Sequence, residues 1–265
     1  MYDPREGYMR ETISEGKWGY INEKREEVIP VIYNEAGNFS EGIALVKLKS
    51  ESFFIDKTGK RLFDFKYDYF GLFRNGLGIV RKSGKYGFIN LTGQEIIPLM
   101  YQQVIDFTEG IAPAQLNNLW GYINTKNETV IPFQYSDASA FYMGLAKVQR
   151  NGKFGCINPR GKEIFPCQFT ELKILYAKVI ETIQNEKYIY YNLDGKQITP
   201  SYNYSTSFYN SSYCIVGKGD SGKRWWPLHK MIGSKWGVID KNGIEVVPLV
   251  YNSYEEAVAV MKNLK

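Results

Sequence analysis

A five-residue motif that recurs at a fixed interval constrains the fold of this chain more than any other feature. The motif reads aromatic, Gly, aromatic or apolar, Ile, then Asn or Asp, and it begins at Trp18, Tyr86, Trp120, Phe154 and Trp236. Positions 86, 120 and 154 lie 34 residues apart, and the step from 18 to 86 is twice 34. Degenerate copies beginning at Ser52 and Tyr188 fill the gaps. A fixed period of this length predicts one small structural unit that is stacked repeatedly.

Other sequence columns keep the same phase. A Pro stands twelve residues after most motif starts, a Tyr or Phe stands three further on, and a Phe-x-Glu-Gly segment follows, as at 39–42 and 107–110. We therefore expect a single domain over 1–265 made of seven units near 18–51, 52–85, 86–119, 120–153, 154–187, 188–235 and 236–252. The step from 188 to 236 is 48, so the sixth unit is 14 residues longer than the period, and we place this insertion within 218–234.

Each unit has the composition of short β-strands joined by tight turns. In the third unit, the aromatic and β-branched run 85–89 predicts a strand, and the Asn90-x-x-Gly93 segment predicts the turn after it. A second strand is expected to end at Pro98, which lacks a backbone donor, and a third to begin at Ile111. Asn127 replaces the turn Gly in the fourth unit, and Arg25 is a poorer substitute in the first. The fold class is therefore all-β.

These columns resemble the bacterial WG repeats, also called KWG repeats. The resemblance covers nearly the whole chain and is weakest at 52–56 and 170–216, where Leu175, Lys178 and Ile180 replace the expected Phe, Gly and Ala. It implies a β-rich binding module, and it supplies no set of catalytic residues. It implies nothing more specific about the partner.

The two ends of the chain bear on whether the repeats form a closed ring or an open solenoid. The last unit lacks a Glu-Gly strand, and residues 6–11 resemble the missing piece. An N-terminal segment that completes the last unit predicts a closed propeller-like ring, which we favour slightly over an open β-solenoid. The tail 253–264 has helical spacing with Ser253 or Asn252 as N-cap, so it predicts a short C-terminal helix, which could instead cap a solenoid.

Composition bounds the chemistry. The 265 residues include three Cys and one His, His229, and carry a net charge of +5. Few His residues argue against a metal site or a histidine base, and we expect no cofactor and no enzymatic activity. No apolar run is long enough to span a bilayer, and the polar N-terminus shows no secretory signal. We therefore expect a cytoplasmic protein, with export as part of a larger chain left open. The repeat-equivalent Glu41 and Glu109 are expected to accept hydrogen bonds from backbone donors.

The insertion is the one segment that departs from the period. Its Gly217-to-Lys223 stretch imitates a phosphate loop and its Gly-Asp-Ser-Gly stretch a serine protease site, but both lack the required context. Basic and aromatic residues gather there, and we predict a partner-binding patch made of Lys223, Arg224, Trp225, Trp226 and Lys230. The Trp side chains could instead fold back onto the repeats as a plug. The function predicted is a non-enzymatic binding or scaffold module for another protein. The alternative is a binder of nucleic acid or anionic glycan through 218–235. The oligomeric state is left open.

Overall fold

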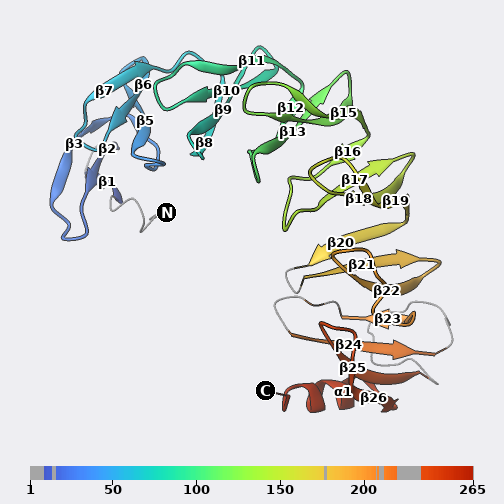
Figure 1. The fold of residues 1–265 in the computed structure, drawn as a ribbon. Helices are drawn as coiled ribbons and strands as arrows, with labels where there is room; N and C mark the ends of the chain where they lie inside the picture. Colours follow the sequence, from blue (N-terminus) through green and yellow to red (C-terminus); the bar gives the residue numbers. More distant parts are fainter. Residues whose placement is uncertain are drawn as a thin grey trace. The chain divides into compact units, whose positions relative to one another are not determined.

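The computed structural model describes residues 16–175, 178–206, 208, 212–219 and 234–264, together with the backbone of 9–13. The chain forms two compact units, residues 1–133 and 134–265, each of which is described by itself. Both units are built of small antiparallel sheets (Figure 1). Five sheets have four strands and two have three among the residues that the structure describes. The expectation of an all-β fold is confirmed.

Unit 1 contains four sheets, the last of which ends two residues beyond it. The first comprises β1 (Met9–Ile13), β2 (Lys17–Ile21) and β3 (Glu27–Tyr33). The second comprises β4 (Glu35–Ala36), β5 (Ile43–Leu48), β6 (Glu51–Asp56) and β7 (Arg61–Asp64). The third comprises β8 (Tyr69–Arg74), β9 (Leu77–Lys82), β10 (Lys85–Asn90) and β11 (Glu95–Tyr101). The fourth comprises β12 (Gln103–Val104), β13 (Ile111–Leu116), β14 (Leu119–Asn124) and β15 (Thr129–Tyr135).

Unit 2 contains three further sheets. The fifth sheet comprises β16 (Asp137–Ala138), β17 (Ala146–Arg150), β18 (Lys153–Ile157) and β19 (Glu163–Phe169). The sixth comprises β20 (Glu171–Leu175), β21 (Val179–Gln184) and β22 (Lys187–Asn192). The seventh comprises β23 (Tyr204–Ser205), β24 (Tyr213–Lys218), β25 (Lys235–Asp240) and β26 (Glu245–Tyr251), and helix α1 (Tyr254–Met261) follows it.

Each sheet spans the boundary between two sequence units. In the third sheet, β8 and β9 precede the aromatic motif, β10 carries it, and β11 carries Pro98. We call the first strand of a sheet its leading edge and the last strand its trailing edge. The N-terminal strand β1 pairs with β2, as β9 pairs with β10, and the seventh sheet has four strands without it. The described part of the segment that we expected to complete the last unit, from Met9 onward, therefore belongs by its pairing to the first sheet, and residues 6–8 lie outside the described residues.

The glycine of the motif is required by a β-bulge on the neighbouring strand. A Cβ atom added to Gly121 would lie 2.7 Å from the carbonyl oxygen of Ile131, the residue before Pro132, and one added to Gly19 would lie 2.6 Å from that of Ile29. In the third sheet, the register shifts between Tyr86 and Phe88, opposite this point. The expectation that the strand ends at Pro98 is therefore wrong: β11 continues to residue 101. A Pro is tolerated there because it lies at a bulge on an edge strand.

The second sheet shows that Gly and Pro are lost together. Phe53 replaces the motif Gly, Asp64 replaces the Pro, and the trailing strand β7 has only four residues. Phe53 lies opposite Asp64. Because Phe53 has a side chain where the other sheets have Gly, a carbonyl of β7 cannot approach β6 as closely as the bulge carbonyl does elsewhere. In the sheets that have both, the Gly of this motif and the Pro twelve residues later therefore belong to one local structure, whereas the sixth unit keeps Pro200 although Ile189 replaces the Gly.

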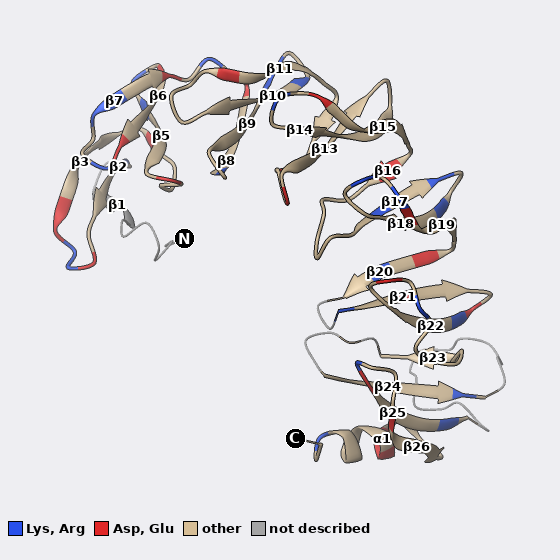
Figure 2. Cartoon of the chain, viewed as in Figure 1, with Lys and Arg blue, Asp and Glu red and all other residues tan. Residues whose placement is uncertain are grey.

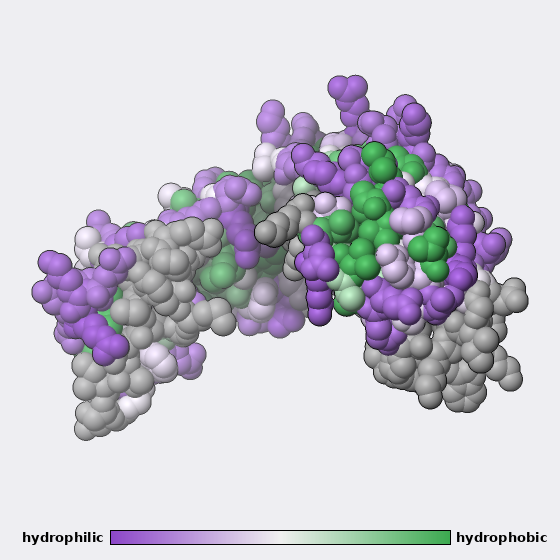
Figure 3. Space-filling view, turned by 90° about the horizontal axis from the view of Figure 1, so that it is seen from below, coloured by the Kyte–Doolittle hydropathy of each residue, from purple (hydrophilic) through white to green (hydrophobic). Residues whose placement is uncertain are grey.

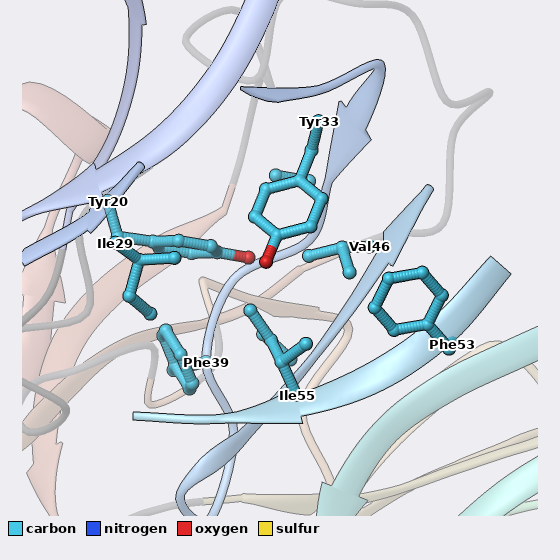
Figure 4. Packing of buried hydrophobic residues seen from close by; sticks show 9 residues of the cluster. Tyr20, Ile29, Tyr33, Phe39, Val46, Phe53 and Ile55 are labelled. Carbon is cyan, nitrogen blue, oxygen red and sulfur yellow. The ribbon is translucent and has the colours of Figure 1, made fainter. Parts of the chain in front are cut away.

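Within each unit, successive sheets pack face to face through buried aromatic and aliphatic side chains. The contact between the first two sheets is shown in Figure 4 by Tyr20, Ile29, Tyr33, Phe39, Val46, Phe53 and Ile55. The rings of Tyr20 and Phe39 lie 4.7 Å apart, and Tyr20 Oη donates a hydrogen bond of 2.8 Å to the carbonyl of Gly37. The aromatic columns of the sequence are therefore core residues that join one sheet to the next.

Helix α1 covers one face of the seventh sheet. Ser253 is its N-cap and accepts from the backbone of Glu256, as expected, although the helix ends at Met261 rather than at 264. Ala257 is buried against Trp236 and Val238. Val238 corresponds to Phe88, which faces the next sheet in unit 1, so α1 lies where a further sheet would pack. No helix in the described part of the chain is long and apolar enough to cross a bilayer.

Candidate functional site

The predicted contact patch lies in the insertion, whose central part is outside the described residues. This holds for all five of its members, Lys223, Arg224, Trp225, Trp226 and Lys230. The structure does describe the ends of the insertion. Lys218 and Lys235 pair across β24 and β25, so the insertion replaces the two-residue turn, such as 83–84, that joins the corresponding strands elsewhere.

The base of the insertion brings two cations together. Lys218 Nζ lies 5.5 Å from the centre of the Tyr202 ring, and Lys235 Nζ donates a 2.6 Å hydrogen bond to Asn252 Oδ1. Like charges placed directly opposite each other destabilise a strand pair. Ser234 is 2% exposed, and its Oγ has no hydrogen-bond partner among the described residues.

Two adjoining pockets follow the leading edges in unit 1. The first, of about 390 Å³, lies between β4–β5 and β8, where Leu45, Phe65 and Phe70 supply apolar walls. The second, of about 490 Å³, is formed by three successive Phe-containing turns. Asn38 and Leu72 line both pockets. Together they form a groove, which we call the leading-edge groove.

The same groove recurs in unit 2. A pocket of about 440 Å³ is lined by residues that lie 102 positions, or three periods of 34, beyond residues of unit 1. Ser139, Ala140 and Lys147 correspond to Gly37, Asn38 and Leu45, and Leu172, Lys173 and Ile174 correspond to Phe70, Gly71 and Leu72. All but Gly71 of the unit 1 residues line the 390 Å³ pocket. The groove is therefore a property of the repeat, although its chemistry differs: an apolar wall at Leu45 is replaced by a lysine.

Hydrogen bonds between repeats hold the turns that border the groove in unit 1. Glu41 accepts from the backbone N–H of Gly76 at 2.8 Å, and Ser40 Oγ donates to the carbonyl of Phe73 at 2.8 Å. Glu41 has φ of 51°, and its equivalent Glu109 has φ of 52°. The expected role of Glu41 as an acceptor for a backbone donor is confirmed.

An ion pair adds charge to the same border. Arg74 Nε lies 3.0 Å from Asp106 Oδ2, and both side chains reach solvent. Burial raises the pKa of the Asp106 carboxyl above its ordinary value, and the nearby Arg74 partly offsets this rise. The pocket therefore presents an acid and a base that already neutralise each other.

A cross-strand position beside the groove differs between sheets. In the second sheet, Glu35 lies opposite Lys47 and forms a 2.8 Å ion pair with it. In the third sheet, Tyr69 lies opposite Arg81, whose guanidinium is 5.8 Å from the ring centres of both Tyr69 and Tyr86. The structure records no ion pair of Arg81 with any described carboxylate. Figure 2 shows Lys and Arg spread over many strands, so this cation is distinguished by its surroundings rather than by abundance.

A polar cluster is buried between the sixth and seventh sheets. Glu181 is 1% exposed, accepts a 2.7 Å hydrogen bond from Tyr190 Oη and lies 3.2 Å from Lys173 Nζ. Ser205 Oγ contacts Tyr190 Oη closely, and Cys214 Sγ is 3.1 Å from Ser205 Oγ. Burial raises the pKa of both the Tyr190 hydroxyl and the Cys214 thiol. These groups satisfy one another within the core.

Exposed apolar side chains follow the trailing edges. In unit 2, Ile244, Val246 and Val250 are 59%, 38% and 56% exposed on β26 and the turn before it, and Figure 3 shows apolar residues gathered at this end. Val28 and Val130 hold the position of Val246 in other sheets and are likewise exposed. Exposed apolar residues at this position therefore belong to the repeat rather than to one specialised site.

The remaining candidate chemistry is sparse in the described part of the chain. The three cysteines are free thiols, Cys156 and Cys214 are fully buried, and burial raises the pKa of Cys156 to about 12. No group of three or more His, Cys, Asp or Glu residues suited to a metal ion occurs within the ranges that the structure describes.

Comparison with known proteins gives a family but no activity. No protein of curated function matches the sequence. Similar solved structures include a eukaryotic initiation factor, with 12% identity, a TM-score of 0.49 and coverage of 89% of this chain and 72% of that one. Hsv2 of Kluyveromyces marxianus is 8% identical, with a TM-score of 0.41 and coverage of 76% of this chain and 82% of that one. The N-terminal domain of Nup159 is 9% identical, with a TM-score of 0.35 and coverage of 62% of this chain and 55% of that one. Scores this low say nothing about what this chain binds.

The family assignment rests on the sequence. The model of the WG containing repeat matches residues 18–50, 53–86, 86–120, 120–154, 154–188 and 236–257. These matches cover well over half of the chain and follow the period found in the sequence. They pass over most of the sixth predicted unit, where β22 lacks the motif Gly and the insertion follows. The chain belongs to the family of proteins built from the WG containing repeat.

Proposed function

We propose that this protein is a non-enzymatic binding or scaffold module that holds another protein in its leading-edge groove. The observation that carries the proposal is the recurrence of one groove at repeat-equivalent residues in both compact units. Repeat proteins commonly bind through a surface that each repeat contributes to in turn. Differences at equivalent positions, such as Leu45 against Lys147, give each groove its own specificity.

The leading edges suit a partner better than the trailing edges. Five trailing strands contain an exposed Pro, at positions 30, 98, 132, 166 and 248. Proline on an edge strand discourages pairing with another chain because it removes a backbone donor. The leading strands β4, β8, β12, β16, β20 and β23 contain none. Backbone pairing with a partner is therefore favoured on the leading side.

The buried polar groups support a structural rather than a catalytic role. A reactive thiol needs a lowered pKa and access to solvent, whereas Cys156 and Cys214 are buried and have raised pKa values. The Glu181 carboxylate is held by Tyr190 and Lys173 in the core. These residues are better explained as a satisfied core network than as an active site.

The insertion supports a second candidate function, the binding of nucleic acid or anionic glycan. The observation in its favour is the Lys218–Lys235 pair at its base, where two cations lie opposite each other. Binding to phosphates would weaken steeply as salt is added. A titration with a single-stranded oligonucleotide that shows no affinity, or affinity independent of salt, rejects the phosphate version.

We also propose that the array of sheets is open at its C-terminal end. Support comes from α1, which packs on the face of the seventh sheet that would receive a further sheet. In the closed ring predicted from the sequence, this face would pack against another sheet, so α1 would have to leave it. A variant ending at residue 252 should expose this apolar face and aggregate if the helix is a permanent cap. A variant that stays monomeric and stable favours the ring.

Partner capture tests the main proposal. Cross-linking in the native host would compare the wild type with Leu72→Asp. The repeat tolerates an Asp at this position, because Asp106 holds it in the next repeat. Leu62→Asp on the trailing strand β7 is the matched control, since Leu72 and Leu62 are 49% and 40% exposed. We expect the same partner to be lost from Leu72→Asp alone. Equal capture by both variants, or catalytic turnover by the purified protein, would overturn the proposal.

A further inference from the structure

Strand β8 is the most extensive of the leading edges. It has six residues, whereas β1 and β20 have five each and β4, β12, β16 and β23 have two each, and its pairing with β9 shifts register between Phe70 and Phe73. It lies at the end of its sheet, so one side of its backbone is not paired within the sheet. An edge strand of this kind is a template for an added strand. Tyr69 and Leu72 are 46% and 49% exposed along it.

The two sides of β8 differ in chemistry. Phe70 packs toward the second sheet, with its ring centre 4.8 Å from that of Phe54, and lines the apolar pocket of about 390 Å³. Tyr69 lies on the opposite side, where it contacts Tyr86 with ring centres 6.4 Å apart. Side chains of an added strand would alternate between these two sides.

The Tyr69 side is cationic. Arg81 is flanked by two tyrosine rings and shares this side with Tyr69 and Tyr86, its cross-strand neighbours. Lys82 and Lys85, which lie opposite each other, are on the Phe70 side, because successive residues of a strand alternate. None of these three cations forms an ion pair within the described ranges. Asp68 is close by in the sequence, but its Oδ2 accepts a 2.7 Å hydrogen bond from the backbone of Ser83. A carboxylate of a ligand on this side would pair with the Arg81 guanidinium.

Other leading-edge cations are neutralised within the protein: Lys47, which holds the position of Arg81 one repeat earlier, and Lys173, which holds the position of Gly71. In the second sheet, Lys47 is paired with Glu35 at 2.8 Å. In unit 2, Lys173 lies 3.0 Å from Glu171 and 3.2 Å from Glu181. Of Lys47, Lys173 and Arg81, only Arg81 thus lacks an ion pair within the described ranges and can accept an external anion.

We propose that β8 binds an extended acidic peptide segment of a partner protein by strand addition. Apolar side chains of the segment enter the pocket beside Phe70 and Leu72, and the alternate acidic side chains meet Arg81 on the Tyr69 side. This proposal rests on the proposed binding function and adds the site and the class of ligand. The partner is recognised by a pattern of alternating apolar and acidic residues rather than by a folded surface.

Fluorescence anisotropy with synthetic peptides tests the proposal on the full chain. The probe is an eight-residue peptide in which glutamate alternates with leucine, and its counterpart has lysine in place of glutamate. We expect the acidic peptide to bind, the basic one not to bind, and the affinity to fall as salt is added. N-methylation of alternate backbone amides should abolish binding, because strand addition needs those donors.

Variants with natural precedents in other repeats locate the site. Arg81→Gln copies Gln115 and Gln149, and Leu72→Asp copies Asp106, so both should fold. Each variant should bind the acidic peptide with about tenfold lower affinity, as expected for the loss of one charge-assisted or apolar contact. Lys126→Gln, in an exposed turn of the fourth sheet, is the control and should bind as the wild type does.

Three outcomes would overturn the proposal: no binding of the acidic peptide, equal binding of the basic peptide, or affinity unchanged in Arg81→Gln. Preferential binding of a single-stranded oligonucleotide at Arg81 would also overturn it, in favour of nucleic acid. If partner capture depends on Leu72 but not on Arg81, strand addition of an acidic segment fails while the binding function stands.

Discussion

The Glu41 carboxylate accepts a 2.8 Å hydrogen bond from the backbone N–H of Gly76, one repeat further along the chain. Glu41 has φ of 51°, a conformation that disfavours side chains and suits Gly. Glu41→Ala should therefore lose about 1 kcal/mol of stability, since the hydrogen bond is removed and the unfavourable conformation stays. Glu41→Gly should lose less. Urea denaturation of both variants measures the difference. Equal losses of stability in the two variants would show that the left-handed backbone conformation at position 41 costs nothing.

The buried pair of Glu181 and Tyr190 should show strong coupling. Ile79 and Phe88 hold the same cross-strand position in the third sheet. Tyr190→Phe should cost about 2 kcal/mol, because the buried carboxylate loses a hydrogen bond. Adding Glu181→Ile should recover most of this loss, since the pair then becomes apolar as in the third sheet. A double-mutant cycle that is simply additive would contradict this account.

Stability should fall at alkaline pH. Burial, together with the 3.0 Å hydrogen bond from Tyr67 Oη to Glu95, raises the pKa of Tyr67 from 10.0 to about 12, and burial raises that of Tyr202 to about 12. Between pH 10 and 12 the unfolded chain loses these protons and the folded chain keeps them, so a rise in pH favours unfolding. Denaturation midpoints should be level just below pH 10 and fall above it. Tyr67→Phe, with Phe169 as precedent in the same column, should make the fall shallower.

The insertion should be removable if it is a contact site. Lys218 and Lys235 pair as Lys82 and Lys85 do, and the latter are joined by two residues. Replacing 219–234 with Asn-Gly, a favoured hairpin turn, should leave stability within about 1 kcal/mol of the wild type. The plug alternative predicts a loss of about 3 kcal/mol from Trp truncation. Thermal melts of this variant and of Trp225→Ala and Trp226→Ala distinguish the two.

Most of the fold could be predicted from the repeat columns. The turn at Asn124, the left-handed conformations of Asn127 and Arg25 and the Ser253 cap were expected from local sequence and are confirmed. The continuation of β11 through Pro98 was not, because a proline is tolerated at a bulge on an edge strand, and the bulge is visible only once its partner Gly87 is known.

The groove could not be predicted in the same way. Its walls come from residues about 34 apart in two or three repeats, so no single motif marks it. One signal was available: at the position opposite the cation, Glu35 becomes Tyr69, which leaves Arg81 unneutralised. The sequence directed attention to the insertion instead, because a break in the period is easier to see than a substitution within it.

Hydrogen–deuterium exchange of the full chain with its captured partner tests the central claim most directly. The account predicts that binding slows exchange along β8 and the pocket-lining segment 38–41, while the trailing strand β11 of the same sheet is unchanged. Protection confined to the insertion, or to the trailing edges, would contradict the claim that the leading-edge groove is the binding surface.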